Sequence, residues 1–337
     1  MDDQNRTDRR NFLRAGAIGS AAIGAMAFTG RAVASTPTIG DIAILQFLCA
    51  AEQIETDLWE QYAEMGEQNP AYRDALQDVL DVDIVIYAAD TRDDELSHDK
   101  FIAAYLRSIG ATPVDLTPFK VIPSPNVIGG GGRLRLTNLT QLTLDTSYYT
   151  RYHNGLNPDF DNDIPQLATI KAQSAIPTKQ IERERDLIGM AGVSGLHFAA
   201  IEQGGSSLYN TLLRQISSVE VLEIVSSIYA TEAIHFAIFN KVLEQYPGFN
   251  NGKGTLVIPD LTHRRQNSAH VMATPTQFLR TDLPRCSVIR PGTPKNSGAV
   301  ASATGLVKSG LFSGQSQTFI DAVVSFAKAA DAATRPF

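Results

Sequence analysis

The amino-acid sequence predicts an all-α protein, a four-helix bundle over residues 41–246 with a long irregular insertion, residues 111–176, between its second and third helices. Three observations predict this class. Four long segments repeat apolar residues with helical periodicity, two of them carry the same Glu-x-x-His motif, and 43% hydrophobic residues suffice for a buried core. Residues 247–337 form a C-terminal extension.

The first two helices follow from capping and periodicity. Residues 41–65 begin with Asp41, a good N-cap. Residues 71–108 are largely helical by pattern and end at Gly110, with Pro113 beyond. One broad face of the first helix collects Leu45, Leu48, Glu52, Glu55, Trp59 and Tyr62.

The insertion is rich in Pro, Gly and Asn, which interrupt regular structure. We expect short strands around residues 133–144 and a short helix near residues 164–173. Irregular segments of this length inside a domain are usually functional or decorate the core.

The third and fourth helices follow the insertion. Pro177 suits the first position of a helix, which we expect to run to about Ile216. The fourth helix spans about 219–245 and stops before Pro247. Residues 249–315 look irregular, and a short helix over about 317–332 ends the chain.

The N-terminus has the features of an export signal. The string RRNFLR at residues 9–14 resembles the twin-arginine consensus, an apolar run follows, and a small-x-small cleavage string stands at residues 32–34. We expect residues 1–34 to be a twin-arginine signal peptide that the export machinery recognises, with Ser35 as the first mature residue. An uncleaved anchor is the alternative. The protein is then periplasmic or secreted.

Composition excludes several classes of function. The formal charge of −7 disfavours nucleic-acid binding, which needs a basic face. Two Cys exclude a disulfide scaffold and a four-Cys metal site, so a metal would be held by oxygen and nitrogen. Beyond the signal we find no run of about 18 apolar residues and expect no transmembrane segment.

Two helices carry a repeated metal-binding motif. Glu95 and His98 on the second helix, and Glu232 and His235 on the fourth, are each three residues apart and so share a helix face. The surroundings of Glu232 are apolar and aromatic. A charged group on such a face must be paired, neutralised or bound to a metal.

The other two helices each contribute a Glu followed seven residues later by a Tyr. These pairs are Glu55 with Tyr62 and Glu202 with Tyr209, and seven residues is nearly two helical turns. Glu52 faces a similar way and is the alternative to Glu55. The equal Glu–Tyr spacing in both halves favours Glu55.

This layout resembles the ferritin-like di-iron superfamily, in which two helices each give one Glu and two give Glu-x-x-His. The resemblance covers about 41–110 and 177–246. Together with the signal it looks like the secreted ferritin-like domain proteins called desiccation- or stress-related. It implies two Fe or two Mn ions, with Glu95 and Glu232 as bridging ligands, and Tyr62 and Tyr209 hydrogen-bonded to ligand carboxylates. The implied metal ligands are Glu55, Glu95, His98, Glu202, Glu232 and His235.

Several other residues are interpreted as structural. We expect His197 to be a packing or surface residue, and Asp94 and Asp99 to be solvated. His153, His263 and His270 lie in segments without periodicity. Cys49 is interpreted as a small core residue, and a Cys49–Cys286 disulfide stays open. The tyrosines could also simply pack in the core.

Three functions are compatible with these patterns. The first is a di-metal oxidoreductase acting on O₂, peroxide or Fe(II), similar to ferroxidases or manganese catalases. The second is iron storage, which the insertion and the extension disfavour. The third is a metal-free, stress-protective bundle. A monomer or homodimer is expected for the first function, and a particle of about 24 subunits for storage.

Overall fold

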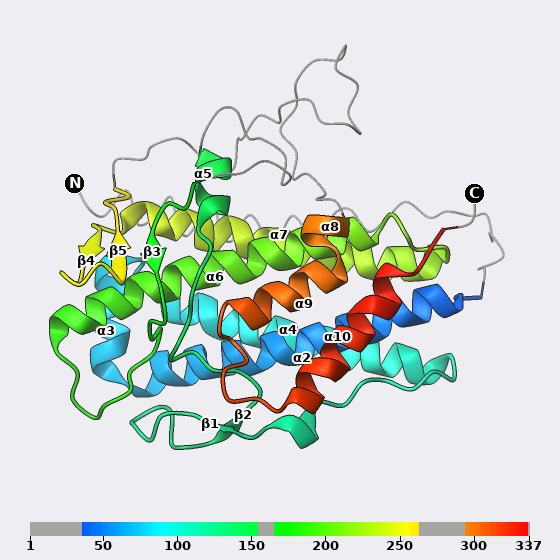
Figure 1. Cartoon of the computed structure of the whole chain (residues 1–337), viewed down its shortest axis with the longest axis horizontal. Helices are drawn as coiled ribbons and strands as arrows, with labels where there is room; N and C mark the ends of the chain where they lie inside the picture. Colours follow the sequence, from blue (N-terminus) through cyan, green and yellow to red (C-terminus); the bar gives the residue numbers. More distant parts are fainter. Residues whose placement is uncertain (1–35, 154–164, 263–293, 336–337) are drawn as a thin grey trace, which may run out of the picture. The chain divides into compact units, whose positions relative to one another are not determined.

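The computed structural model describes residues 36–153, 165–262 and 294–335, and it confirms the all-α prediction. The signal predicted for residues 1–34 lies outside the described residues. Four long helices run side by side as the bundle: α2 (Ile39–Gln68), α4 (Ile84–Ser108), α6 (Glu184–Leu212) and α7 (Val219–Val242) (Figure 1). They pack in pairs, α2 with α4 and α6 with α7.

The start of α2 is fixed by a capping box, three residues earlier than predicted. Thr38 is the N-cap, and its hydroxyl accepts from the Asp41 N–H at 3.1 Å while the Asp41 carboxylate accepts from the Thr38 N–H at 2.8 Å. The same carboxylate accepts from the backbone N–H groups of Ser217 and Ser218, at 2.7 and 3.2 Å. Asp41 therefore ties the start of α2 to the start of α7.

The predicted second helix is two helices. It divides into α3 (Pro70–Val79), which packs against α6, and α4. Between them Asp81 accepts from the backbone N–H of Asp83 at 3.0 Å, a local turn that competes with the helical ladder. The break lets α4 run back along α2.

The third bundle helix begins at Glu184 instead of Pro177. Before it, the Glu182 carboxylate accepts from the backbone N–H groups of Thr178 and Lys179, at 3.1 and 3.0 Å. These bonds hold a turn where a helix was expected, since backbone donors that a side chain has already satisfied do not need the ladder.

In its described residues, 111–153 and 165–176, the insertion contains short strands and one α-helix. Strand β1 (Ile122–Pro123) pairs antiparallel with β2 (Leu134–Arg135), which confirms part of the strand prediction. The helix predicted near residues 164–173 is wrong, because Thr169–Ile170 form β3, which pairs with β5 (Leu256–Ile258) of the C-terminal extension. The helix of the insertion is α5 (Ser147–His153), and η1 is a short 3-10 turn (Thr117–Phe119).

A buried aspartate anchors the insertion to the bundle. The Asp57 carboxylate on α2 accepts from the backbone N–H groups of Leu136 and Thr137, both at 3.0 Å, and from the Thr137 hydroxyl at 2.7 Å. Because all three donors are buried, they depend on Asp57 for their hydrogen bonds.

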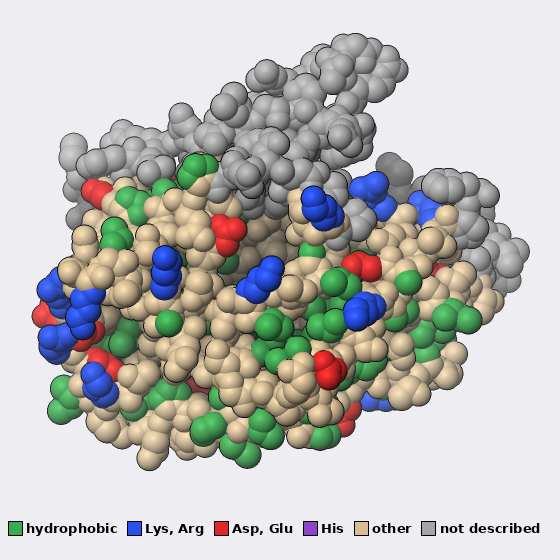
Figure 2. Space-filling view, viewed as in Figure 1, with side chains coloured by type: hydrophobic (Ala, Val, Ile, Leu, Met, Phe, Trp, Pro, Cys, Tyr) green, Lys and Arg blue, Asp and Glu red, His purple; other side chains and the backbone are tan. Residues whose placement is uncertain are grey.

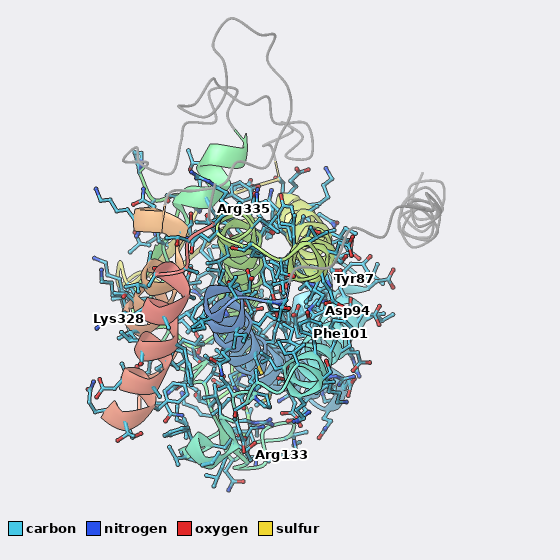
Figure 3. The ribbon with its side chains drawn as sticks, turned by 90° about the vertical axis from the view of Figure 1, so that its right-hand side faces the viewer. Tyr87, Asp94, Phe101, Arg133, Lys328 and Arg335 are labelled. Carbon is cyan, nitrogen blue, oxygen red and sulfur yellow. The ribbon has the colours of Figure 1, made fainter. Side chains whose placement is uncertain are left out.

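The extension covers the opposite side of the bundle from α4. Helix α10 (Gln317–Asp331) confirms the predicted terminal helix and packs along α2, as Figure 3 shows with Lys328 on one flank and Asp94 on the other. Helices α8 (Pro294–Ser297) and α9 (Ala299–Lys308), which were not predicted, pack on α6. Figure 2 shows charged side chains scattered singly over the face that carries α9 and α10.

The end of the fourth bundle helix continues as the 3-10 turn η2 (Leu243–Gln245), and β4 (Phe249–Asn250) then pairs with β5. The segment Val219–Gln245 is long and apolar enough to cross a membrane by length and composition alone, although no such segment was expected beyond the signal. Its Glu232 and His235 are buried in the bundle, as expected of a core helix.

Candidate metal centre

The four bundle helices bring six buried acidic and imidazole side chains together. Glu52 comes from α2, Glu95 and His98 from α4, Glu202 from α6, and Glu232 and His235 from α7. The four carboxylates have no exposed surface, and the two imidazoles are 8% and 6% exposed. Full burial of four carboxylates is unusual and requires compensating positive charge.

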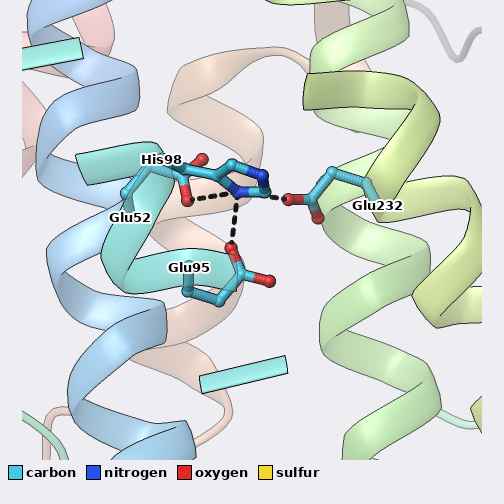
Figure 4. A group of neighbouring side chains, drawn as sticks. All are labelled: Glu52, Glu95, His98 and Glu232. Atoms are coloured by element: carbon cyan, nitrogen blue, oxygen red, sulfur yellow. Dashed lines mark hydrogen bonds and ion pairs between the residues drawn. The ribbon is translucent and has the colours of Figure 1, made fainter. Parts of the chain in front are cut away.

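The first group surrounds His98 (Figure 4). Its Nδ1 lies 3.1 Å from a Glu95 oxygen, 3.3 Å from a Glu52 oxygen and 3.9 Å from a Glu232 oxygen. These four residues come from three helices and each offers one atom to a common point. They could therefore hold one metal ion.

The second group surrounds His235. Its Nδ1 lies 3.2 Å from Oε1 of Glu95 and 3.2 Å from Oε2 of Glu202, and these three residues could hold a second ion. Glu95 belongs to both groups, through different oxygens. The two Glu-x-x-His motifs thus face each other across the bundle, as their repeat predicted.

Several carboxylate oxygens in the cluster have no hydrogen-bond donor among the described residues. They are Oε2 of Glu52, Oε1 of Glu95, Oε1 of Glu202 and both oxygens of Glu232. The first two lie 3.3 Å from Nδ1 of His98 and 3.2 Å from Nδ1 of His235, but each of these nitrogens already hydrogen-bonds another carboxylate oxygen. A buried carboxylate oxygen without a donor costs free energy that a protein avoids. Cations are the partners that this set of oxygens lacks, and oxygen with imidazole nitrogen is a ligand set that suits Fe or Mn.

The pKa values describe the same imbalance of charge. Burial, reinforced by the neighbouring Glu95, raises the pKa of Glu52 to about 8, and burial raises the pKa of Glu232 well above its ordinary value. Glu95 is the exception, because although burial favours its neutral form, hydrogen bonds from His235 and His98 hold its pKa at about 2. Without cations, the cluster retains protons to reduce its repulsion.

Two aromatic residues act on the carboxylates in a symmetrical way. The Tyr209 hydroxyl, seven residues after Glu202, donates to Glu52. Burial raises the pKa of Glu202 to about 7, and Trp59, seven residues after Glu52, lowers it slightly, although the indole N–H has no well-formed hydrogen bond to a described residue. Tyr209 therefore contacts a carboxylate of the cluster as the resemblance implied, and Trp59 is the matching residue on α2.

The sequence favoured Glu55 over Glu52 as the glutamate of the first helix, but Glu52 is the one that lies in the group around His98. The seven-residue spacing that favoured Glu55 with Tyr62 also joins Glu52 with Trp59, and this second pairing was the available signal. Glu55 belongs to neither group around the two His. It is partly buried one turn further along α2 and lines a cavity beside the cluster.

Tyr62 contacts a histidine and has no hydrogen bond to the cluster. Its hydroxyl lies 2.7 Å from Nδ1 of His197, and both residues are 1% exposed. The packing role expected for His197 holds, with this hydrogen bond in addition. Burial lowers the pKa of His197 to about 3, so its imidazole is neutral.

Asp94 is half exposed and supports His235. Its carboxylate lies 3.0 Å from Nε2 of His235, so it is not simply solvated as predicted. Although burial lowers the pKa of His235, the neighbouring Glu202, Asp94 and Glu95 raise it well above its ordinary value, so both ring nitrogens carry a proton in the metal-free protein. Nε2 donates to Asp94, and Nδ1–H faces Glu95 and Glu202, where a cation would replace that proton. A carboxylate behind the far nitrogen of a histidine is a common support for a metal ligand.

The remaining candidates lie away from the cluster. Asp99 accepts from the thiol of Cys49, whose pKa burial raises to about 12, and Cys49 is a free, buried core residue. Cys286, His263 and His270 fall outside the described residues, so the open disulfide is untested. His153 ends helix α5 in the insertion.

Comparisons with known proteins agree with this geometry. Residues 40–245 match the family model described as a ferritin-like domain, which includes all six residues of the cluster and more than half of the chain. No curated protein and no solved structure matches the chain.

Removing the support of His235 should weaken metal binding. In Asp94→Ala the imidazole loses the acceptor that fixes its orientation and tautomer, so we expect affinity for Fe(II) or Mn(II) to fall about 10- to 100-fold. Competition with a chromophoric chelator measures this. Asp93→Ala is the matched control, because Asp93 is exposed and pairs only with Arg92. Equal affinities in the two variants would show that Asp94 does not support the site.

The stability of the metal-free protein should decrease as pH rises. Glu52 and Glu202 have folded pKa values of about 8 and about 7, above the ordinary value of 4.5, so the stability that they contribute is present at low pH and is lost as pH rises through those values. Bound cations replace those protons.

We therefore expect the Tm difference between metal-loaded and metal-free protein to widen by about 5 °C or more from about pH 5 to pH 8. Differential scanning calorimetry measures both forms. The Glu52→Gln/Glu202→Gln double variant, which cannot lose these protons, should show a flatter metal-free profile. A Tm difference between metal-loaded and metal-free wild-type protein that stays constant between these pH values would contradict the prediction.

Proposed function

This chain belongs to the ferritin-like family, and we propose that its Glu/His cluster binds two Fe or two Mn ions and uses them for oxidoreductase chemistry on O₂, peroxide or Fe(II). The observation that carries the proposal is the set of buried carboxylate oxygens without donors in Glu52, Glu95, Glu202 and Glu232. Two divalent cations would supply the missing partners and offset the repulsion among the carboxylates.

The proposed ligands come from all four bundle helices. Glu52, Glu95, Glu232 and His98 would hold one ion, and Glu95, Glu202 and His235 would hold the other. Glu95 and Glu232 lie between the two, since Glu95 contacts both His and Glu232 belongs to the His98 group. When bound, a pair of such ions supplies the electrons exchanged with O₂ or peroxide.

The chain's own residues hold the ligands in place and exclude water. Tyr209 donates to Glu52, Trp59 acts on Glu202, and Asp94 orients His235. Trp59 stacks on Phe239 with ring centroids 4.9 Å apart, so the cluster is closed on this side by aromatic packing. A dry site strengthens every electrostatic interaction within it.

Catalysis is favoured over iron storage by what covers the bundle. Helix α10 packs along α2 and helices α8 and α9 pack on α6, so the extension occupies surfaces that a shell of closely packed copies would use. A metal-free protective role is disfavoured, because a structural bundle gains nothing from four buried carboxylates.

A matched pair of variants tests the ligand set and chooses between two neighbouring glutamates. Glu52→Gln removes a proposed ligand, so we expect metal content to fall from two ions per chain to one or fewer. Glu55→Gln, one helical turn away on the same helix, should retain two. Elemental analysis of the purified chain from Ser35 onward measures both. Wild-type protein that folds and binds neither Fe nor Mn would refute the proposal.

The same preparations separate enzyme from store. We expect a monomer or dimer by gel filtration, with consumption of O₂ or peroxide that depends on the loaded metal and is lost in Glu52→Gln. A particle of many subunits containing far more than two Fe per chain would favour storage.

We further propose that the twin-arginine machinery exports the protein to the periplasm or beyond. The support is the RRNFLR string at residues 9–14, ahead of an apolar run and a cleavage string. Replacing both arginines, Arg9→Lys with Arg10→Lys, should leave uncleaved full-length chain in the cytoplasm. Fractionation and mass spectrometry of the N-terminus measure this. Export of the double variant would contradict the route, and a wild-type chain that stays cytoplasmic would contradict export.

A further inference from the structure

A cavity of about 370 Å³ lies beside the cluster. Its wall combines bundle helices α2 and α6 with a segment of the insertion, residues 143–148, and with helices α8, α9 and α10 of the extension. The two segments that decorate the bundle therefore both line one hollow.

The cavity reaches the cluster through Glu55 and Gly205, which both line it. Gly205 leaves no room for a side chain, because a Cβ there would lie 2.2 Å from a Glu232 oxygen and 3.8 Å from a Glu55 oxygen. The Glu232 carboxylate thus lies against the backbone of α6 at the cavity wall. Only a glycine separates the hollow from a proposed metal ligand.

The cavity is larger than O₂, peroxide or Fe(II) needs. A single water requires only about 10–15 Å³ of such volume, whereas sites for small organic ligands measure about 300–1,000 Å³. A channel for peroxide or a ferrous ion would not need a chamber of this size. The volume fits an organic molecule.

The residues that line the cavity disfavour a negatively charged ligand. The described residues that line it include many apolar side chains, several neutral polar ones, two acidic side chains, Glu55 and Asp145, and no Lys or Arg. An anion placed there would lose its hydration without gaining a cationic partner. The wall therefore disfavours an anion, and its apolar side chains suit a molecule with a large apolar part. The apolar side chains are Phe47, Ile54, Leu58, Leu144, Tyr148, Ile201, Leu208, Leu306 and Val323, with several alanines between them.

One buried polar group in the wall lacks a partner. His197 lines the cavity, and its Nε2 has no hydrogen-bond partner among the described residues. The Tyr62 hydroxyl is 2.7 Å from Nδ1 of the same ring. Because this hydroxyl is buried and must place its proton on an acceptor, it donates to Nδ1. Nε2 then carries the ring proton and is a donor. An oxygen acceptor on the ligand would satisfy it.

We propose that this cavity binds a neutral, largely apolar organic molecule bearing an oxygen that accepts a hydrogen bond, and holds it beside Glu55 and Glu232 as the substrate of the metal centre. The substrate role rests on the proposed function, but binding itself does not need the metal. The insertion and the extension then have a shared purpose, which is to complete the wall of the binding cavity.

Gly204 provides a clean way to fill the cavity. It lines the hollow, and a Cβ there would meet nothing within 4 Å, so alanine fits without displacing a neighbour. The longer side chain of leucine would take up space in the hollow. Alanine or leucine also has a better helix propensity than glycine, by roughly 1 kcal/mol. Ala104→Leu on the exposed face of α4 is the matched control for added apolar volume.

The test uses 1-octanol as a neutral probe and octanoate as its anionic counterpart, in isothermal titrations of the metal-free and metal-loaded chain. We expect octanol to bind both forms, and octanoate to bind at least about 10-fold more weakly, because its charge finds no partner. Gly204→Leu should weaken octanol binding at least about 10-fold, Gly204→Ala should weaken it less, and Ala104→Leu should leave it unchanged. His197→Phe should also weaken it.

Octanol binding that Gly204→Leu does not change, or octanoate binding as strong as octanol binding, would overturn the inference. Failure of octanol to bind a chain that holds two metal ions would overturn the cavity assignment and leave the metal centre standing. Octanol binding by a chain that takes up no metal would instead refute the proposed function alone, because binding is measured in both forms.

Discussion

The structure depends on keeping several carboxylates inside a protein core. Four glutamates without exposed surface surround two imidazoles. Burial, together with repulsion from the neighbouring carboxylates, raises the pKa of Glu52, Glu202 and Glu232. The bundle tolerates this arrangement because each helix contributes one side of it, and because tyrosine, tryptophan and aspartate side chains support the ligands from behind. Cations are the partners that such a cluster requires.

The supporting residues repeat the symmetry of the ligands. A residue seven positions after one helix's glutamate acts on the other helix's glutamate, Tyr209 on Glu52 and Trp59 on Glu202. The hydrogen bond from Tyr209 to Glu52 thus joins α6 to α2. The two halves differ at the Nε2 atom of the histidine. In His235 this atom contacts the Asp94 carboxylate.

The segments outside the bundle give the centre its surroundings. Asp57 holds the insertion on α2, and strand β3 of the insertion pairs with β5 of the extension. Together with α8, α9 and α10 they enclose the cavity that ends at Glu55 and Gly205. A plain bundle could bind the same ions, but it would leave this side of α2 and α6 open to water.

The sequence by itself determined the bundle and most of the Glu/His cluster, because helical periodicity and the Glu-x-x-His spacing are local properties. Glu95, His98, Glu202, Glu232 and His235 lie together as predicted, and α7 and α10 have nearly the predicted bounds. Only the tertiary structure placed Glu52 instead of Glu55 with His98, since two glutamates one turn apart share a helix face and only the packing of α2 separates them. It also placed β3 where a helix was expected, because the partner strand β5 lies about ninety residues further along the chain.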